Sequence, residues 1–213
     1  MKLNWFRRAV AFKTTQSWRT VPHVSYIYEV DVSQSKRPDG ISFNTFVLHV
    51  IAKAVRSAPR VNAHIRYNRL FATGRVCVKD KINIAMPCLL PNGEMRTVAL
   101  MDVGGKSMAQ LQQHIGEARM KAGKNLDIKT LDVIRWARES KQCTITVSNT
   151  GSLCKDLNGT LAMLEIIPPQ IVAIGVGAIQ NGRLPLCVAF DHRALNFSDI
   201  LPFLRAIQSG FRS

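Results

Sequence analysis

Residues 186–196 read Leu-Cys-Val-Ala-Phe-Asp-His-Arg-Ala-Leu-Asn, an apolar run that ends in the charged triplet Asp191-His192-Arg193. The run is typical of a buried strand, and residues 197–204 after Asn196 have the pattern of the start of an amphipathic helix. A histidine at the end of a buried strand stands where a general base could face a cleft. Most single histidines are structural, so a hydrogen-bonded histidine at a strand end is the alternative.

The chain before this stretch predicts a β-hairpin. Residues 171–179 and 184–190 are apolar runs, and Gln180-Asn181-Gly182-Arg183 joins them. Asn-Gly between two such runs is a strong signal for a tight turn, because both residues tolerate a positive φ. Pro185 falls at the start of the second run, where a strand tolerates it. We therefore expect two neighbouring antiparallel strands, the second of which leads to His192.

The remaining elements follow from periodicity. Helices are predicted at 4–18, 42–57, 106–121, 131–137 and 197–211, and further strands at 24–32, 75–78, 82–86 and 144–147. Ser42 is expected to cap the second helix and Pro59 to stop it. Helices and strands mix along a chain without an internal repeat or a linker. This order predicts one α/β or α+β domain with a mixed sheet.

Composition narrows the class of protein. The chain has 213 residues, 46% of them hydrophobic, which is enough to fill the core of one domain. No apolar run approaches the roughly 20 residues of a membrane span, and residues 1–8 lack the apolar core of a secretory signal. The 5 cysteines form no Cys-x-x-Cys pair and no cluster with histidines. We expect reduced thiols in a cytoplasmic protein without a metal site.

Four segments together resemble one family. The triplet at 191–193, followed by two apolar residues and Asn196, resembles the end of the catalytic domain of the dihydrolipoamide acyltransferases, which are the core subunits of 2-oxo acid dehydrogenase complexes. Residues 20–26 (TVPHVSY), 144–151 (TITVSNTG) and 166–177 (IIPPQIVAIGVG) resemble further segments of that family in the same order. Chloramphenicol acetyltransferase shares the fold and a related motif. A single Asp-His-Arg has little specificity, but four ordered segments over nearly the whole chain have much more.

The resemblance implies a fold and an activity. The fold would be the chloramphenicol acetyltransferase-like α/β fold, a mixed sheet with flanking helices. Residues 1–213 would form a single acyltransferase domain, without the lipoyl and subunit-binding domains that family members usually carry before it. The activity would be transfer of a short acyl group between coenzyme A and a thiol, with dihydrolipoamide as the expected thiol. No lipoyl attachment is expected in this chain.

The same resemblance assigns roles to three residues. His192 would be the general base, the hydroxyl of Ser148 would hydrogen-bond the oxyanion, and Asn196 would order the active-site loop. From the residues alone, the favoured interpretation of Ser148 is a turn residue that bonds its own backbone, and the resemblance reverses that order. His23 would line the substrate channel or pack as a strand residue.

Two features beside the triplet affect the activity that the resemblance implies. Asp191 and Arg193 are expected to form a structural ion pair. Phe197 stands where the family has glycine, so a backbone that needs positive φ or close approach there would have to rearrange. We expect the phenylalanine at position 197 to affect the activity of the protein more than its fold.

The resemblance also implies an oligomer. In the family the active site lies between subunits of a trimer, with the histidine from one chain and the serine from its neighbour, and coenzyme A and lipoamide enter from opposite ends. We therefore expect a homotrimer or a multiple of three, with a lipoyl-bearing protein as its partner.

The high net positive charge suggests further classes of binding partner. The 29 Lys and Arg against 14 Asp and Glu give +15, which raises nucleic acid, an anionic membrane surface or a polyanionic cofactor as partners. The basic residues are spread along the chain and accompany no nucleic-acid motif, so we expect neither a nucleic-acid nor a membrane partner. Such a surface attracts coenzyme A as readily as DNA. The leading hypothesis is a coenzyme A-dependent acyltransferase; the alternatives are a catalytically weakened oligomeric scaffold and a polyanion-binding protein.

Overall fold

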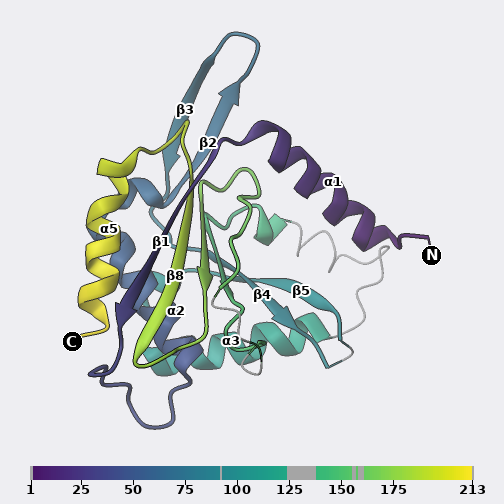
Figure 1. The fold of residues 1–213 in the computed structure, drawn as a ribbon. Helices are drawn as coiled ribbons and strands as arrows, with labels where there is room; N and C mark the ends of the chain where they lie inside the picture. The colour runs from purple at the N-terminus through teal and green to yellow at the C-terminus, as the bar shows by residue number, and fades with distance from the viewer. Residues whose placement is uncertain (1, 92, 124–137, 155–156, 158–160, 213) are drawn as a thin grey trace.

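The computed structural model describes residues 2–91, 93–123, 138–154, 157 and 161–212. This part of the chain forms a six-stranded mixed sheet in the order β1-β8-β7-β6-β4-β5 (Figure 1). The strands are β1 (His23–Asp31), β4 (Ile84–Leu89), β5 (Met95–Leu100), β6 (Ile145–Asn149), β7 (Val172–Val176) and β8 (Arg183–Asp191). β6 runs parallel to both β4 and β7, and the other neighbours are antiparallel. The mixed sheet expected from the sequence is confirmed.

Three of the described helices pack together on one face of the sheet. They are α2 (Phe43–Ala54), α3 (Met108–Gly123) and α5 (Phe197–Gly210), and α2 contacts both of the others. A fourth helix, α1 (Trp5–Thr20), lies apart from α5 and leads directly into β1 (Figure 1). Most residues of α2 are buried, because the sheet, α3 and α5 surround it.

The caps of these helices follow from the sequence. The Ser42 side chain accepts a hydrogen bond from Thr45 N at 3.1 Å and so caps α2, as predicted. The predicted helix over 42–57 is α-helical only to Ala54, and the 3₁₀ turn η1 (Val55–Ser57) continues it before Pro59 starts a second turn, η2 (Pro59–Val61). A further 3₁₀ turn, η3 (Val103–Gly105), precedes α3. The helix predicted over 131–137 lies outside the described residues.

Two of the strands, β2 (Ala63–Asn68) and β5, were not predicted from the sequence. β2 and β3 (Thr73–Val78) form a separate hairpin that projects from the body (Figure 1), and only the β3 half was expected. β5, the edge strand that begins at Met95, was also missed. Both missed strands carry polar residues, Arg66 in β2 and Arg96 in β5, within short apolar patterns. Such short runs hold too few apolar residues to reveal a period.

The predicted hairpin of β7 and β8 is confirmed. Their register pairs Val172 with Phe190 and Val176 with Leu186, and the turn residues Asn181 and Gly182 both have positive φ, 49° and 72°. Pro185 is the third residue of β8, and its carbonyl accepts a hydrogen bond from Gly177 N, one residue beyond the end of β7. Pro185, which has no backbone N–H to donate, therefore lies just outside the paired residues of β7 and β8.

Side chains of β7 and β8 alternate between two cores. Val172, Ile174 and Val188 belong to the large core under the helices, whereas Ala173 and Ala189 lie in a small cluster with Ile166 on the other face. That second face is built from small residues. A Cβ at Gly175 would collide with the carbonyl of Ala162, so the segment at 161–166 passes directly over the sheet there.

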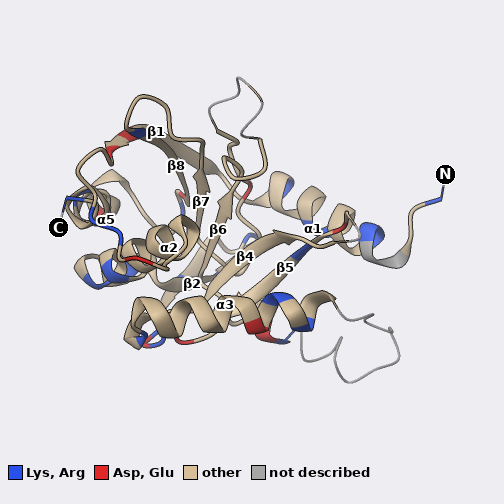
Figure 2. Cartoon of the chain, turned by 90° about the horizontal axis from the view of Figure 1, so that it is seen from below, with Lys and Arg blue, Asp and Glu red and all other residues tan. Residues whose placement is uncertain are grey.

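The basic residues cover several elements. Figure 2 shows Lys and Arg on α1, on α3 and near the C-terminus, with no single face that holds them all. In the described part of the chain, no helix is both long and apolar enough to span a membrane. All 5 cysteines are free thiols, and Cys88, Cys143 and Cys187 are buried as expected.

Candidate active site

His192 is the first residue after β8, in a turn built by its neighbour Asp191. The carbonyl of Asp191 accepts hydrogen bonds from Ala194 N and Leu195 N at 2.9 and 3.0 Å, which closes the turn. The backbone N–H of His192 donates to Pro22 O at 3.0 Å. The imidazole itself is exposed and meets the Phe190 ring edge-on, at 6.0 Å between centroids. The backbone is thus fixed while the ring remains accessible.

The carboxylate of Asp191 is fully buried and bound by Arg193. The guanidinium donates to it in a fork, Nε to Oδ1 at 2.9 Å and Nη2 to Oδ2 at 2.6 Å, and Arg193 N adds a bond at 3.0 Å. These bonds raise the pKa of Arg193. The ion pair expected from the sequence is present. Asp191 therefore acts on the conformation of the turn that carries His192.

Arg193 also joins this turn to the projecting hairpin. Its guanidinium lies over the ring of Tyr67, 5.2 Å from the centroid. Tyr67 belongs to β2, a strand that the sequence prediction missed, so this contact was missed with it. The alternation of Ala63, Ile65 and Tyr67 is a trace of the strand in the sequence, but it is too short to predict one.

Asn196 is the N-cap of α5. Its Oδ1 accepts from Asp199 N at 3.2 Å and from Ser198 Oγ at 2.6 Å, while Asp199 Oδ2 accepts from Asn196 N at 2.9 Å. This reciprocal pair is a capping box. Within one chain the carboxamide is committed to starting the helix immediately after the His192 turn.

Phe197, the departure from the family glycine, does not strain the backbone. It is the first residue of α5, and the described non-glycine residues with positive φ are Ala72, Asp102 and Asn181. Its ring meets Tyr26 at 5.1 Å and Phe190 at 6.1 Å, both nearly edge-on. Phe190 in turn contacts His192. Phe197 is thus part of an aromatic cluster that reaches the candidate base.

Ser148 lies near the end of β6 and is 7% exposed. No described residue forms a hydrogen bond with its hydroxyl, and the turn-residue interpretation is wrong because Ser148 lies within the strand. After it, Asn149 binds Asn44 at the start of α2, Nδ2 to Oδ1 at 3.3 Å. A Cβ at Gly151 would collide with the backbone of Gly177, so only glycine fits at this bend.

The sheet keeps Ser148 and His192 apart. The register aligns Ser148 with Gly175 of β7 and Gly175 with Cys187 of β8. His192 lies five residues beyond Cys187, which is about 17 Å along the strand. The two strand spacings from β6 to β8 add about 10 Å across the sheet. One chain therefore does not bring the two residues into one site.

His23 is a packed strand residue. Its Nδ1 lies 2.8 Å from Val21 O, and its Nε2 lies 3.1 Å from Ile166 N. The ring donates from Nδ1 and accepts at Nε2, which is the neutral tautomer. Burial lowers the pKa of His23. Of the two interpretations left open by the sequence, the packed residue is the one observed.

The family model described as "2-oxoacid dehydrogenases acyltransferase (catalytic domain)" matches residues 1–211. One similar curated protein is the dihydrolipoyllysine-residue acetyltransferase component of the pyruvate dehydrogenase complex of Buchnera aphidicola, 23% identical over 224 residues. The match covers 92% of this chain and 52% of that protein, so the chain spans about half the length of this relative.

Solved structures share the fold. The cubic core of the pyruvate dehydrogenase multienzyme complex superposes with a TM-score of 0.77 at 18% identity, over 100% of this chain and 90% of that one. A dihydrolipoamide acetyltransferase of Azotobacter vinelandii, studied for the role of a serine, a histidine and an asparagine in its mechanism, gives 0.76 at 17% identity over 100% and 90%. Chloramphenicol acetyltransferase gives 0.62 at 18% identity over 98% and 96%. The expected fold is confirmed, and the chain belongs to the 2-oxoacid dehydrogenase acyltransferase (catalytic domain) family.

Proposed function

We propose that this chain transfers a short acyl group between coenzyme A and a thiol, with dihydrolipoamide as the acceptor or donor. Family membership gives the reaction class, and the turn at 191–193 carries the assignment within the chain. It holds a histidine by its backbone and leaves the imidazole accessible, as a general base requires. Residues 1–213 act as one acyltransferase domain, and a lipoyl-bearing protein delivers the dihydrolipoyl group.

The imidazole of His192 takes the proton of the attacking thiol. A thiol is mostly protonated near neutral pH, so removal of this proton makes the nucleophile. The thiolate adds to the thioester carbonyl carbon, and a tetrahedral oxyanion forms. The C–S bond to the leaving thiol then breaks, and the imidazolium returns the proton to that sulfur.

Ser148 stabilises the oxyanion in this proposal. Its hydroxyl is a donor that no described residue occupies, at the end of a rigid strand. Asn196 orders the turn through its cap of α5, and does not touch the substrate. His23 acts through packing alone.

The active site lies between two chains of a trimer or a larger multiple of three. The separation of Ser148 and His192 along the sheet supports this arrangement, because a second chain must supply one of them. The β2–β3 hairpin also exposes apolar side chains that an assembly would cover: Leu70 is 84% exposed and Phe71 70%. Light scattering that returns a monomer at micromolar concentration would contradict the assembly.

A thioester-exchange assay tests the activity. Purified protein is given acetyl-coenzyme A and dihydrolipoamide, and acetyl-dihydrolipoamide is measured. His192→Ala should lower the rate by roughly a hundredfold to ten-thousandfold, and Ser148→Ala by roughly a hundredfold or more. An unchanged rate in His192→Ala would refute the assignment of the base. A wild-type protein that accepts no short-chain coenzyme A ester would favour the scaffold hypothesis.

The cytoplasm is the proposed location. Five free thiols, three of them buried, are compatible with a reducing compartment. Fractionation of cells that express the full-length protein tests this location.

A further inference from the structure

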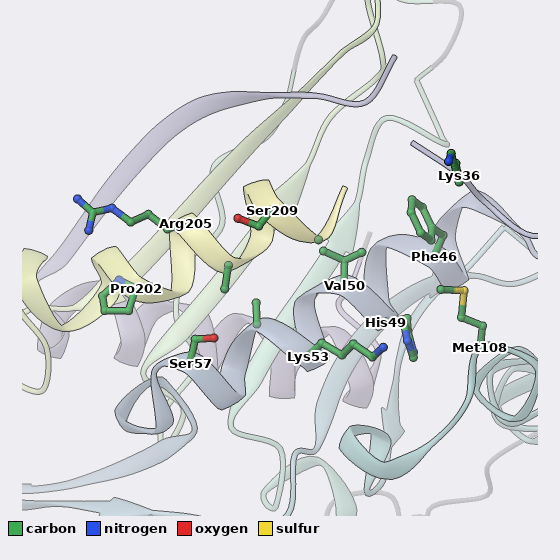
Figure 3. A pocket seen from close by; sticks show the side chains of 13 residues that line it. Lys36, Phe46, His49, Val50, Lys53, Ser57, Met108, Pro202, Arg205 and Ser209 are labelled. Atoms are coloured by element: carbon green, nitrogen blue, oxygen red, sulfur yellow. The ribbon is translucent and has the colours of Figure 1, made fainter. Parts of the chain in front are cut away.

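A cavity of about 520 Å³ lies between α2 and α5 (Figure 3). Most of its lining comes from these two helices, with Ser57 of η1, Met108 of α3 and Lys36 of the loop after β1 completing it. None of His192, Ser148 and Asn196 lines it. The volume is in the range of small-molecule sites in proteins.

The packing of the two helices leaves this space. At Gly210 of α5 the helices approach so closely that a Cβ would meet Val50 Cγ1 at 2.8 Å. Elsewhere along the cavity the facing residues include Ala54 on α2 and Ala206 on α5, whose short side chains leave the gap unfilled. The cavity therefore has an apolar wall.

The polar part of the lining is cationic. Lys36, Lys53 and Arg205 contribute positive charges, and no Asp or Glu is among the lining residues. In the described part of the chain none of these three cations forms an ion pair with a carboxylate. Unpaired like charges around one cavity repel each other, and a bound anion would relieve that repulsion.

His49 adds a buried polar group to the same cavity. It is 7% exposed, it lines the cavity, and no described residue forms a hydrogen bond with its ring. Since no described residue occupies the ring nitrogens, they are available to a ligand in the cavity. In Figure 3 the side chains of Lys53 and His49 extend toward the same end of the cavity. Burial and then the charge of Lys53 lower the pKa of His49.

We propose that this cavity binds a small organic phosphate. The phosphate lies against Lys53 and His49, and the apolar body of the ligand lies against Val50 and Ala206. A phosphate monoester carries a charge of about −1.5 to −2 near neutral pH, which suits several unpaired cations better than a carboxylate does. Lysine binds phosphate as a point charge. The site is separate from the proposed acyl-transfer residues, so it stands independently of that activity.

Calorimetric titration with phenyl phosphate tests the site. The wild-type protein should bind phenyl phosphate, and it should bind benzoate more weakly and phenol not at all. Lys53→Gln should weaken the binding of phenyl phosphate by roughly tenfold or more, since a hydrogen bond to a charged group is lost. Lys13→Gln removes the same charge from α1, an exposed position remote from α5 (Figure 1), and should leave the Kd within about twofold.

The outcomes separate a built site from a general effect of the basic surface. Equal weakening in Lys53→Gln and Lys13→Gln would overturn the proposal, as would a wild-type protein that binds no phenyl phosphate at millimolar concentration. His49→Gln gives a second measurement and should also weaken binding. If that variant fails to fold, the comparison of the two lysine variants, both at exposed positions, still decides.

Discussion

Ser148 and His192 lie near opposite ends of the central sheet, because β8 runs antiparallel to β6 and β7. Ser148 is level with Cys187 in the register, and His192 follows five residues later. A hydrogen-bond donor and a base that serve one tetrahedral intermediate must both lie within a few ångströms of it. Because Ser148 and His192 of one chain lie too far apart for this, the proposed site needs residues from two chains.

Co-expression of two inactive variants should restore activity. If each site takes His192 from one chain and Ser148 from a neighbour, a mixture of His192→Ala and Ser148→Ala chains contains some interfaces with both residues intact. Random assembly in equal amounts gives about a quarter of the wild-type sites. Acyl transfer by the purified mixture measures this. A rate no higher than that of the separate variants would show that one chain supplies both residues.

Arg193→Met should destabilise the protein by about 3 kcal/mol, because it leaves the buried carboxylate of Asp191 without its guanidinium. Urea unfolding measures the change in the free energy of unfolding. Arg60→Met is the matched control. It removes the ion pair between Arg60 and Asp199, in which the Arg60 side chain is 58% exposed. Such a pair contributes about 0.2–1 kcal/mol. Equal losses in the two variants would contradict the structural role of the 191–193 turn.

Phe197→Gly should lower stability by about 1–2 kcal/mol, since the edge-on contacts with Tyr26 and Phe190 are lost. Because the backbone at this position is helical, no strain is relieved and the rate of acyl transfer should change little. Phe197→Leu is the control that keeps most of the apolar contact. A rate increase of an order of magnitude in the glycine variant would instead show that the phenylalanine obstructs the site.

Stability should fall as the pH drops below the ordinary histidine pKa of about 6.5. Burial lowers the pKa of four histidines, His23, His49, His64 and His114. The unfolded chain therefore binds more protons than the folded chain just below that pH, and the free energy of unfolding rises with pH through this window. Urea midpoints at pH 5.5 and 7.5 measure it.

His114→Gln provides the control for this pH dependence. Its side chain can still accept from Met101 N, the bond that His114 Nε2 makes at 3.3 Å, but it no longer titrates. The difference between the two midpoints should shrink in this variant. A wild-type midpoint that is higher at pH 5.5 than at pH 7.5 would contradict the assigned direction of the shifts.

Strong local patterns predicted much of this fold. Asn181-Gly182 between two apolar runs predicted the β7–β8 hairpin, and Ser42 before an apolar stripe predicted the start of α2. These features depend on residues close together in the chain, where φ preferences and side-chain caps act. β2 and β5 could not be predicted in this way, since pairing with another strand stabilises them more than their own composition does.

The sequence by itself determined the strand that ends at Asp191-His192-Arg193, the order of the family-like segments and the fold that they imply. Only the tertiary structure decided what surrounds those residues. It showed that Asn196 caps a helix, that Arg193 lies over Tyr67 of a distant strand, and that Phe197 packs in an aromatic cluster without backbone strain. It also separated Ser148 from His192. The physical reason is that β6 and β7 are far apart in the sequence, so tertiary contacts and not a local turn set how they pair. That pairing fixes the distance between Ser148 and His192.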